Sequence, residues 1–387
     1  MSRGLVALLA LTCGAAVANI YWAQPLLDDI GRSLGVATGT AAAVVVAAQV
    51  GYALGLGFVV PLGDLLRRRR LVVGMLATAA VACLASAAAP SLAVLAAVTV
   101  GLGVASAVVQ VLVPLASDLA ADHERGRVVG LVVSGLLIGI LSARTVAGLV
   151  AAAFGWRAVF VLAAALMLAL TAALARGLPH LEPKTRGAYP ALLRSVLTLV
   201  REERVLRLRM AYGAVGMLSF TLLWTGLTLV LSADPFDYGE ATIGLFGLAG
   251  LAGALAAQGA GRLADRGRGR AGTGFFWSIA LLGWGLAALL DTGIAFLVAG
   301  LVVFDAGLQG QHVLNQSAIY ALRPEARSRL NTAYMVSVFI AAALGSALAS
   351  IAFGLGGWGL VCALGAACPL VALTLWARDG LAHRDHR

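Results

Sequence analysis

Charged residues and cysteine are scarce in this sequence. Only 12% of the 387 residues are charged, against about 25% in an ordinary soluble domain, and 61% are hydrophobic. A water-soluble globular protein is therefore excluded. The four cysteines, with no CxxC pair and no cluster of histidine partners, lie inside apolar runs at Cys13, Cys83, Cys362 and Cys368. We predict that they are small core residues, and we predict no metal site.

Motifs of several enzyme classes are missing as well. The sequence has no glycine-rich GK[ST] loop, and Lys184 is its single lysine, so ATP-driven transport by this polypeptide is not expected. HExxH and GxSxG do not occur either. The sequence therefore predicts a protein that is not an enzyme, with no catalytic residue and no cofactor.

The net charge of +10 has a topological explanation. In a soluble protein it would favour nucleic-acid binding, but here all but one of the 28 cations are arginines, and they lie between apolar runs. Membrane topology accounts for such a pattern without a nucleic-acid partner.

Apolar runs of about 20 residues, the length that crosses a bilayer as a helix, are what the sequence has in abundance. We expect membrane spans at residues 4–22, 38–60, 71–89, 91–115, 128–153, 157–176, 207–231, 241–260, 272–290, 293–317, 330–354 and 358–377. The predicted fold class is an all-α integral membrane protein with twelve transmembrane helices.

The distribution of arginine predicts how these spans are oriented. When alternate loops are assigned to alternate sides, every cation except Arg32, Arg157 and Arg144 falls on one side or in the linker and tail of that side. Lys and Arg remain on the cytoplasmic side of a membrane. We therefore predict a multi-pass protein of the cell membrane with both termini in the cytoplasm.

The longest connection divides the chain into two halves. The predicted domains are an N-terminal six-helix bundle at 1–176, a cytoplasmic linker at 177–206, a C-terminal six-helix bundle at 207–377 and a cytoplasmic tail at 378–387. Within the linker, apolar and charged residues alternate with helical spacing from Leu192 to Arg204. This pattern predicts a short amphipathic helix at the membrane interface.

The two halves repeat one another at three polar landmarks. Gly63-Asp64 and Ala264-Asp265, each followed by arginines, are 201 residues apart. Arg125-Gly126-Arg127 and Arg327-Ser328-Arg329 are 202 residues apart, as are Gly155-Trp156 and Gly357-Trp358. Parallel six-helix repeats build one class of transporter, whose substrate site lies between the halves near mid-membrane.

The segment from Gly261 to Arg266, with Arg268 and Arg270, resembles the loop signature of the major facilitator superfamily. Pro61-Leu62-Gly63-Asp64 with its arginine run is a degenerate first copy, in which Val60 replaces the usual opening glycine. Three further stretches, at 18–27, 139–144 and 315–332, resemble the bacterial arabinose-efflux-permease-like and drug-efflux-like carriers.

The resemblance implies a conformational latch formed by Asp64, Asp265, Arg266 and Arg268. Each aspartate follows the cytoplasmic end of a predicted span, where a carboxylate can face the positive N-terminal end of a helix. By resemblance the partner helix belongs to the opposite half, so the contact would hold the cytoplasmic side closed. The alternative is that the arginines only fix membrane orientation.

Two charged residues lie well inside predicted spans, where each costs several kcal/mol unless it is paired or hydrated, about 2.5 to 3.5 kcal/mol on insertion scales. Arg144 in the fifth span and Asp305 in the tenth are expected at similar depth. They would form a pair or share a hydrated cavity, or each would be satisfied by carbonyls or glutamines within its own half.

The tenth span carries a polar stripe formed by Asp305, Gln309, His312 and Gln316. Such a stripe must face protein or water, because lipid offers no hydrogen-bond partner. Asp305 is the first candidate for a proton-coupling site and His312 the second, although a lone membrane histidine is more often a packing residue.

The resemblance also implies which residues line the central cavity, since spans 1, 4, 7 and 10 do so in the superfamily. The candidates for substrate contacts are Asn19, Gln24, Gln110, Tyr212, Trp224 and Gln309. Trp224 is equally well explained as a residue of the aromatic belt at a membrane interface. In the fourth span, Ala97 stands where many proton-driven exporters carry an arginine, which leaves Arg144 as a substitute.

The predicted function is secondary active transport of a small organic solute by alternating access, with proton-coupled efflux favoured. An uptake symporter of the same fold and a non-transporting membrane sensor or scaffold remain alternatives, and a membrane-embedded enzyme is a more distant one. The expected partners are the solute, protons and the lipid bilayer, and the expected state is a monomer.

Overall fold

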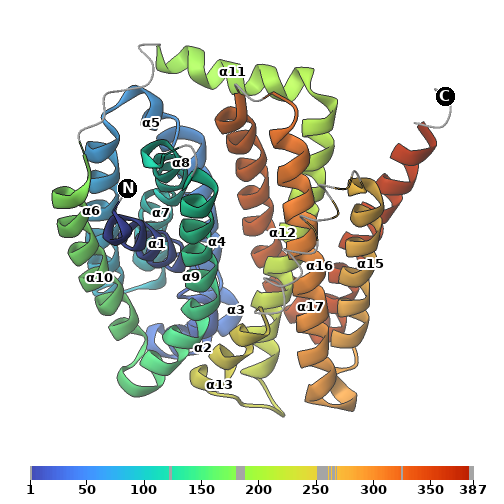
Figure 1. The fold of residues 1–387 in the computed structure, drawn as a ribbon. Helices are drawn as coiled ribbons and strands as arrows, with labels where there is room; N and C mark the ends of the chain where they lie inside the picture. The colour runs from blue at the N-terminus through green and yellow to red at the C-terminus, as the bar shows by residue number, and fades with distance from the viewer. Residues whose placement is uncertain are drawn as a thin grey trace. The chain divides into compact units, whose positions relative to one another are not determined.

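The computed structural model describes residues 2–121, 124–179, 188–250, 260, 263, 266, 268–323 and 326–382. These residues are almost entirely helical (Figure 1). The chain divides into two compact units. Unit 1 comprises residues 1–197 and 231–247, and unit 2 comprises residues 198–230 and 248–387.

The helices of unit 1 follow the apolar runs of the sequence. They are α1 (Arg3–Ala18), α2 (Leu27–Leu34), α3 (Thr38–Ala41), α4 (Ala43–Leu54), α5 (Leu62–Leu65), α6 (Arg68–Ala87), α7 (Leu92–Ser106), α8 (Val109–Leu119), α9 (Arg125–Phe154), α10 (Trp156–Gly177) and α13 (Glu240–Leu245). A π-helical turn, Gly55–Val59, extends α4. Serine N-caps mark the start of two helices: the Ser2 and Ser91 hydroxyls accept hydrogen bonds from the first-turn amides of α1 and α7.

The described residues of unit 2 form long helices. They are α12 (Arg204–Leu231), α15 (Gly269–Ala287), α16 (Ile294–Tyr320) and α17 (Arg327–Ala382). Inside α17 the backbone leaves the helical region at Gly356 and Gly357, where Gly357 has a φ of 60°. Glycine adopts this conformation without steric cost, so the break falls between the two predicted spans 330–354 and 358–377. The linker helix α11 (Tyr189–Glu202) begins in unit 1 and ends in unit 2.

Eight helical stretches in the part of the chain described here are long and apolar enough to cross a membrane. Two of them join shorter elements: Thr38–Val59 comprises α3, α4 and the π-helical turn, and Leu92–Leu119 comprises α7 and α8. One of them, Arg329–Asp379, contains the break in α17. Two further predicted spans correspond to α1, with 16 residues, and α15, with 19. The predicted span 241–260 falls on α13, on the 3-10 helix Phe246–Gly250 and on the stretch 251–259, which lies outside the described residues. The helical membrane fold is confirmed, and the count of twelve spans stays a prediction.

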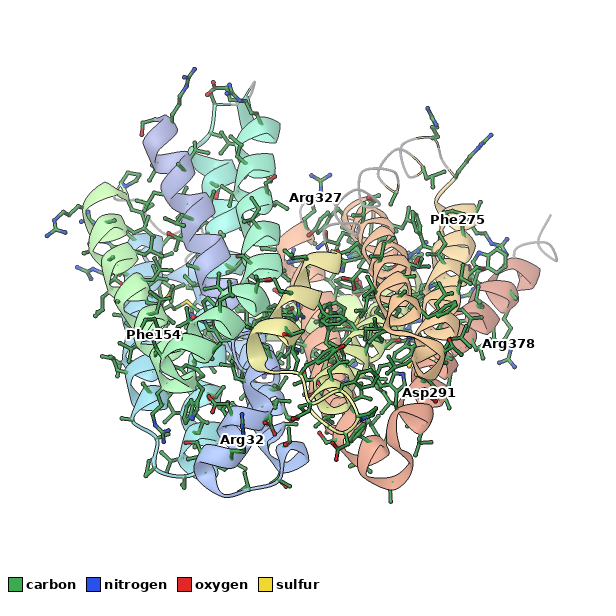
Figure 2. The ribbon with its side chains drawn as sticks, turned by 90° about the horizontal axis from the view of Figure 1, so that it is seen from below. Arg32, Phe154, Phe275, Asp291, Arg327 and Arg378 are labelled. Atoms are coloured by element: carbon green, nitrogen blue, oxygen red, sulfur yellow. The ribbon has the colours of Figure 1, made fainter. Side chains whose placement is uncertain are left out.

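Large apolar side chains are exposed on these helices. Phe154 is 79% exposed and Phe275 57% exposed, and both can be followed in Figure 2. In water such a surface would cause aggregation, but in hydrocarbon it needs no cover, because lipid tails are as apolar as the side chains. The exposed apolar surface is what a membrane-spanning helix requires.

Glycines allow the helices of unit 1 to approach closely. In the contact between α1 and α9, a Cβ added to Gly139 would lie 2.2 Å from the carbonyl oxygen of Gly14. In the contact between α4 and α7, a Cβ added to Gly51 would lie 2.1 Å from the carbonyl oxygen of Val100. Small residues are the usual means by which membrane helices bring their backbones together.

This close approach leads to the first prediction. We expect Gly51→Ala to destabilise the protein by about 1 to 3 kcal/mol, because the new methyl group meets backbone atoms that can move only by separating two helices. Gly101→Ala is the matched control, since a Cβ on Gly101 in α7 would have nothing within 4 Å. The midpoint of thermal unfolding of the purified protein in detergent measures the stability of both variants. Equal midpoints for the two variants would contradict the tight α4–α7 contact.

Candidate functional site

Arg144 in α9 lies buried within unit 1, with 3% of its surface exposed. Its Nε donates a hydrogen bond to Gln24 Oε1 at 2.9 Å, and its guanidinium carbon lies 5.0 Å from the centre of the Tyr21 ring. The structure thus joins two residues that the sequence analysis assigned to different roles, Arg144 to coupling and Gln24 to the substrate cavity. A glutamine of the same unit thus satisfies part of the hydrogen-bonding capacity of Arg144. This is compatible with the alternative in which each intramembrane charge is satisfied within its own half.

The chain places Gln24 beside Arg144 by ending α1 early. Helix α1 ends at Ala18, and a turn leads to the short 3-10 helix Gln24–Leu26, which has Pro25 in its first turn. Proline suits the start of a helix because its missing N–H would have no partner there. The polar residues that follow α1 therefore lie on turns rather than on a continued helix, and this gives them freedom to face α9.

Asn19 lies at the same turn and is 3% exposed. Its Oδ1 accepts hydrogen bonds from Trp22 Nε1 at 3.0 Å and from the Cys83 thiol at 3.9 Å. Its Nδ2 contacts the sulfur of Met167 at 3.5 Å. The amide thus links the end of α1 to α6 and α10, so Asn19 has a clear structural role in addition to the substrate contact predicted for it.

A third polar group of unit 1 lies on α4 and α8. The Tyr52 hydroxyl is buried and forms a hydrogen bond with the side chain of Gln110, a predicted cavity residue at the start of α8. Gln49 in α4 has no exposed surface, and neither its Oε1 nor its Nε2 has a partner among the described residues. A buried amide without partners costs about 1 to 3 kcal/mol. Gln49 was not predicted as a site residue, although a glutamine inside an apolar span is a visible signal in the sequence.

The polar groups of unit 2 gather on α16 and α17. His312 Nδ1 lies 3.1 Å from the Tyr334 hydroxyl, and Asn315 Nδ2 donates to the same hydroxyl at 3.4 Å. Gln311 Nε2 donates to Asn315 Oδ1 at 3.2 Å. The buried polar residues of α16 are Asp305, at 5% exposure, Gln311 and Asn315, whereas Gln309 and His312 are only partly buried. Gln311, Asn315 and Tyr334 were not predicted as site residues from the sequence.

Arg209 in α12 is a further polar residue that the sequence analysis missed. Its guanidinium donates to Thr273 Oγ1 at 3.2 Å and to Asn315 Oδ1 at 3.4 Å, and lies 5.7 Å from the centre of the Tyr212 ring. Tyr212 is itself buried and packs against Trp277 at 6.3 Å. Arg209 lies close to the linker cations in the sequence, and for this reason it was counted among the cytoplasmic arginines that determine membrane orientation.

Trp224, the other predicted cavity residue of α12, is 2% exposed and packs against Phe220 at a centroid distance of 6.1 Å. A tryptophan of the interfacial belt keeps one end in contact with water. Its burial in unit 2 therefore favours an interior role over the belt alternative.

The residues of the predicted latch are only partly described. Asp265 lies outside the described residues, and so does the side chain of Asp64, whose backbone belongs to α5. Arg266 is exposed in a turn, and Arg268 is the N-terminal flanking residue of α15, with its amide donating to the Leu263 carbonyl at 3.0 Å. The latch therefore stays a prediction.

The arginine run after Asp64 does more than the topological interpretation assigns to it. Arg68 is buried, donates from Nε to the Gly63 carbonyl at 3.1 Å, and forms an ion pair with Asp118 at the end of α8. Arg69 donates to the Ala175 carbonyl of α10. Two members of the run thus join the loop to two neighbouring helices of unit 1.

Long apolar helices, close glycine contacts and isolated buried polar clusters define a polytopic helical membrane protein. A model of the Major Facilitator Superfamily matches residues 7–318. The uncharacterized transporter YgaY of Escherichia coli O157:H7 is 46% identical over 378 residues, which cover 98% of this chain and 96% of that protein. The chain belongs to the Major Facilitator Superfamily, and its class is that of multi-pass membrane transporters with small-molecule substrates.

More distant proteins are similar as well. A chloramphenicol resistance protein of Streptomyces lividans is 28% identical over 310 residues, which cover 78% of each chain. The structure of the nucleoside transporter NupG matches with a TM-score of 0.77 at 14% identity, over 97% of this chain and 99% of that one. At so low an identity the structural likeness concerns the fold alone.

Proposed function

We propose that this protein is a proton-coupled exporter of a small organic solute, working by alternating access in the cell membrane. The observation that carries the proposal is a buried carboxyl group, Asp305, within the membrane helix α16. An ionisable residue inside a membrane is costly and is by default a functional one. A carboxyl group is able to bind and release a proton as its surroundings change, which is what proton coupling requires.

Several features fit this assignment. His312 and Tyr334 form a second titratable contact along α16, and Arg144 supplies a buried cation on α9. That Arg144 and Asp305 share a hydrated pathway is part of the proposal. The name of the Streptomyces lividans relative fits the export of drug-like compounds. Both termini are assigned to the cytoplasm, the protein is taken to act as a monomer, and no enzymatic activity is assigned to it.

The substrate contacts of the proposal come from both units. Asn19, Gln24 and Gln110 in unit 1, and Tyr212, Trp224 and Gln309 in unit 2, offer amides, a hydroxyl group and aromatic rings. Such a set suits an uncharged or weakly charged organic molecule, because aromatic faces bind its apolar part and amides fix its orientation.

Flux measurements in proteoliposomes test the function directly. The purified chain is reconstituted, a pH gradient is imposed, and a panel that includes chloramphenicol and nucleosides is followed on both sides. Solute movement against the direction of proton flow supports the exporter. Movement with the protons indicates an uptake symporter, and no movement of any compound favours a sensor or scaffold.

The proposed latch leads to a second prediction. If Asp64 and Asp265 each stabilise a helix N-terminus only while the cytoplasmic side is closed, changing either to Asn removes that charge attraction from one state. Such a contact is worth roughly 0.3 to 1 kcal/mol when exposed and up to about 2 kcal/mol when partly buried. The ratio of open to closed states should therefore rise about twofold to thirtyfold.

Cysteines introduced into the proposed cavity, in a chain without its native cysteines, report this change through their rate of labelling from the cytoplasmic side. Asp237→Asn is the matched control, since Asp237 lies in a loop assigned to the opposite side. Unchanged labelling in both latch variants would mean that the motif serves topology rather than gating.

A further inference from the structure

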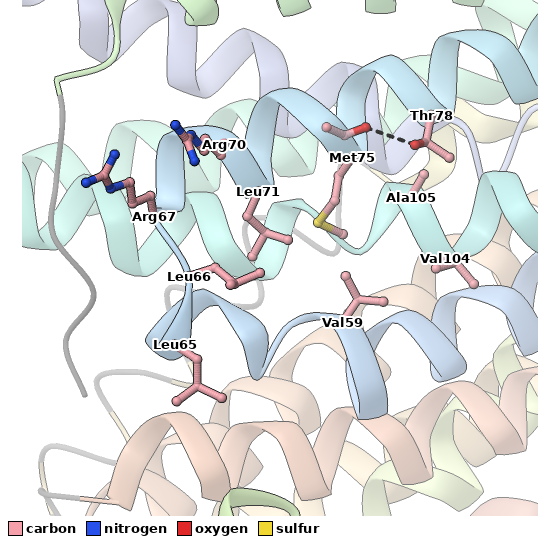
Figure 3. A pocket seen from close by; sticks show the side chains of 11 residues that line it. Val59, Leu65, Leu66, Arg67, Arg70, Leu71, Met75, Thr78, Val104 and Ala105 are labelled. Atoms are coloured by element: carbon pink, nitrogen blue, oxygen red, sulfur yellow. Dashed lines mark hydrogen bonds between the residues drawn. The ribbon is translucent and has the colours of Figure 1, made fainter. Parts of the chain in front are cut away.

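Unit 1 contains a cavity of about 630 Å³ that none of the roles above uses. It lies between α6, α7 and the segment that joins the π-helical turn to α6 (Figure 3). Its walls are apolar, with Val59, Leu66, Leu71, Met75 and Val104 among the lining residues. The volume is within the range of small-ligand sites, about 300 to 1,000 Å³.

The cations of the cavity are confined to one end. Figure 3 shows Arg67 and Arg70 together at that end, with Met75, Thr78 and Ala105 toward the other. Between them in the sequence, Arg68 forms an ion pair with Asp118 and Arg69 donates to the Ala175 carbonyl; neither of these two lines the cavity. The cation end also holds the N-terminus of α6, which no side chain of the described residues caps. Its first-turn amides add positive potential to that of the two guanidinium groups.

The cavity has the length of one membrane leaflet. From Arg67 to Thr78 the chain advances 11 residues, or about 16 Å at 1.5 Å per helical residue. Half of a hydrocarbon core of about 30 Å is about 15 Å. A molecule with its charged group at the arginines would therefore reach the middle of the bilayer with its other end.

The cavity opens on the outer face of α6. Gly74 and Thr78, which line it, are exposed, and Val81 follows on the same stripe at 65% exposure. A Cβ added to Gly74 would meet nothing within 4 Å, so the space above it is free. The Thr78 hydroxyl donates to the Gly74 carbonyl at 2.9 Å, which satisfies it within the helix. An apolar chain can therefore lie along this stripe without covering an unsatisfied polar group.

We propose that this cavity binds an anionic phospholipid. The phosphate lies at Arg67 and Arg70, and one acyl chain runs along Leu71, Gly74 and Met75 toward the bilayer centre. Basic pockets between membrane helices bind anionic head groups in this way, and each cation near the membrane surface strengthens the attraction about fivefold. The inference does not depend on which solute is transported or on how transport is coupled.

Native mass spectrometry of the full chain in detergent tests the proposal. Dioleoylphosphatidylglycerol, dioleoylphosphatidylcholine and inorganic phosphate are titrated separately. We expect one phosphatidylglycerol to be retained with higher affinity than phosphatidylcholine, and phosphate alone to be retained hardly at all. In Arg67→Gln with Arg70→Gln, affinity for phosphatidylglycerol should fall about thirtyfold. Arg3→Gln with Arg378→Gln, two exposed arginines outside the cavity, is the charge-matched control and should change affinity less than twofold.

A second variant keeps the arginines and fills the apolar part. Gly74→Phe should remove most of the retained phosphatidylglycerol, whereas Val81→Phe, on the same stripe outside the cavity, should not. This variant also decides the matter if the double arginine variant does not fold. Retention of phosphatidylglycerol by Gly74→Phe at the wild-type level, or equal binding of free phosphate and lipid, would overturn the proposal.

Discussion

Asp305→Asn is expected to abolish proton-driven solute accumulation while the protein still inserts and folds. Asn keeps the shape of the buried side chain but cannot exchange a proton, so the solute and proton movements become independent. A pH gradient of one unit stores about 1.4 kcal/mol per proton and sustains about a tenfold solute gradient with one coupled proton. The variant should therefore let the solute equilibrate to about equal concentrations across the membrane.

The measurement is solute accumulation in proteoliposomes at an imposed pH gradient, with solute exchange at equal pH as the check on folding and binding. Asp291→Asn is the matched control, because Asp291 is an exposed carboxylate of unit 2 in the short 3-10 helix Leu290–Thr292. It should leave accumulation unchanged. Wild-type accumulation in Asp305→Asn would remove Asp305 from the coupling mechanism.

The ion pair between Arg68 and Asp118 should show a strong asymmetry between its two partners. The Arg68 side chain is 7% exposed and the Asp118 side chain 36% exposed. Asp118→Asn removes the carboxylate charge from its contact with a buried guanidinium, and we expect it to cost about 2 kcal/mol, as for hydrogen bonds to charged groups. Arg68→Met leaves a carboxylate that water can reach, and should cost less than about 1 kcal/mol.

Thermal midpoints in detergent of the two single variants and the double variant test this asymmetry. The double variant should resemble Arg68→Met alone, because the buried guanidinium is absent from both. Asp379→Asn serves as the control, since its ion pair with Arg204 spans 3.7 Å and Arg204 is 72% exposed. If Arg68→Met proves the more damaging single change, the stabilising contact is the one from Arg68 to the Gly63 carbonyl rather than the ion pair.

Helix positions were largely predictable from the sequence. The predicted spans 128–153 and 157–176 correspond to α9 at Arg125–Phe154 and α10 at Trp156–Gly177. Because a bilayer requires about 20 consecutive apolar residues, span length and span boundaries are visible in composition alone. The turn between these two helices is at Gly155, which has a φ of 80°, a conformation that favours glycine in membrane and soluble proteins alike.

Helix faces were far less predictable. Soluble helices reveal their buried side through alternating polar residues, but a membrane helix is apolar all round. The stripe from Asp305 to Gln316 was therefore the only available guide for α16, and it omitted the buried Gln311 and Asn315. Nothing in the local sequence identifies these two residues as more buried than Gln309 or His312.

The long-range contacts could not be predicted for a related reason. Arg144 meets Gln24 across 120 positions of the chain, and Arg68 meets Asp118 across 50. Such pairs depend on which helices are neighbours and on their rotation, both of which are set by glycine contacts such as that of Gly51 with Val100. The sequence showed the charges and the glycines separately, but not their register.

Three long, unbroken helices relate the protein to the thickness of its membrane. Helices α9, α12 and α16 contain 30, 28 and 27 residues, which gives lengths of about 45, 42 and 40 Å. A hydrocarbon core is about 30 Å thick, and a typical tilt of about 20° shortens a helix by only about 6%. Each helix is therefore longer than the hydrocarbon core by roughly 8 to 12 Å, and this excess, summed over both ends, lies in the head-group layers. Bilayers a few ångströms thicker would enclose more of each helix. The length of the lipid acyl chains therefore determines how much of these helices lies in hydrocarbon, in both units.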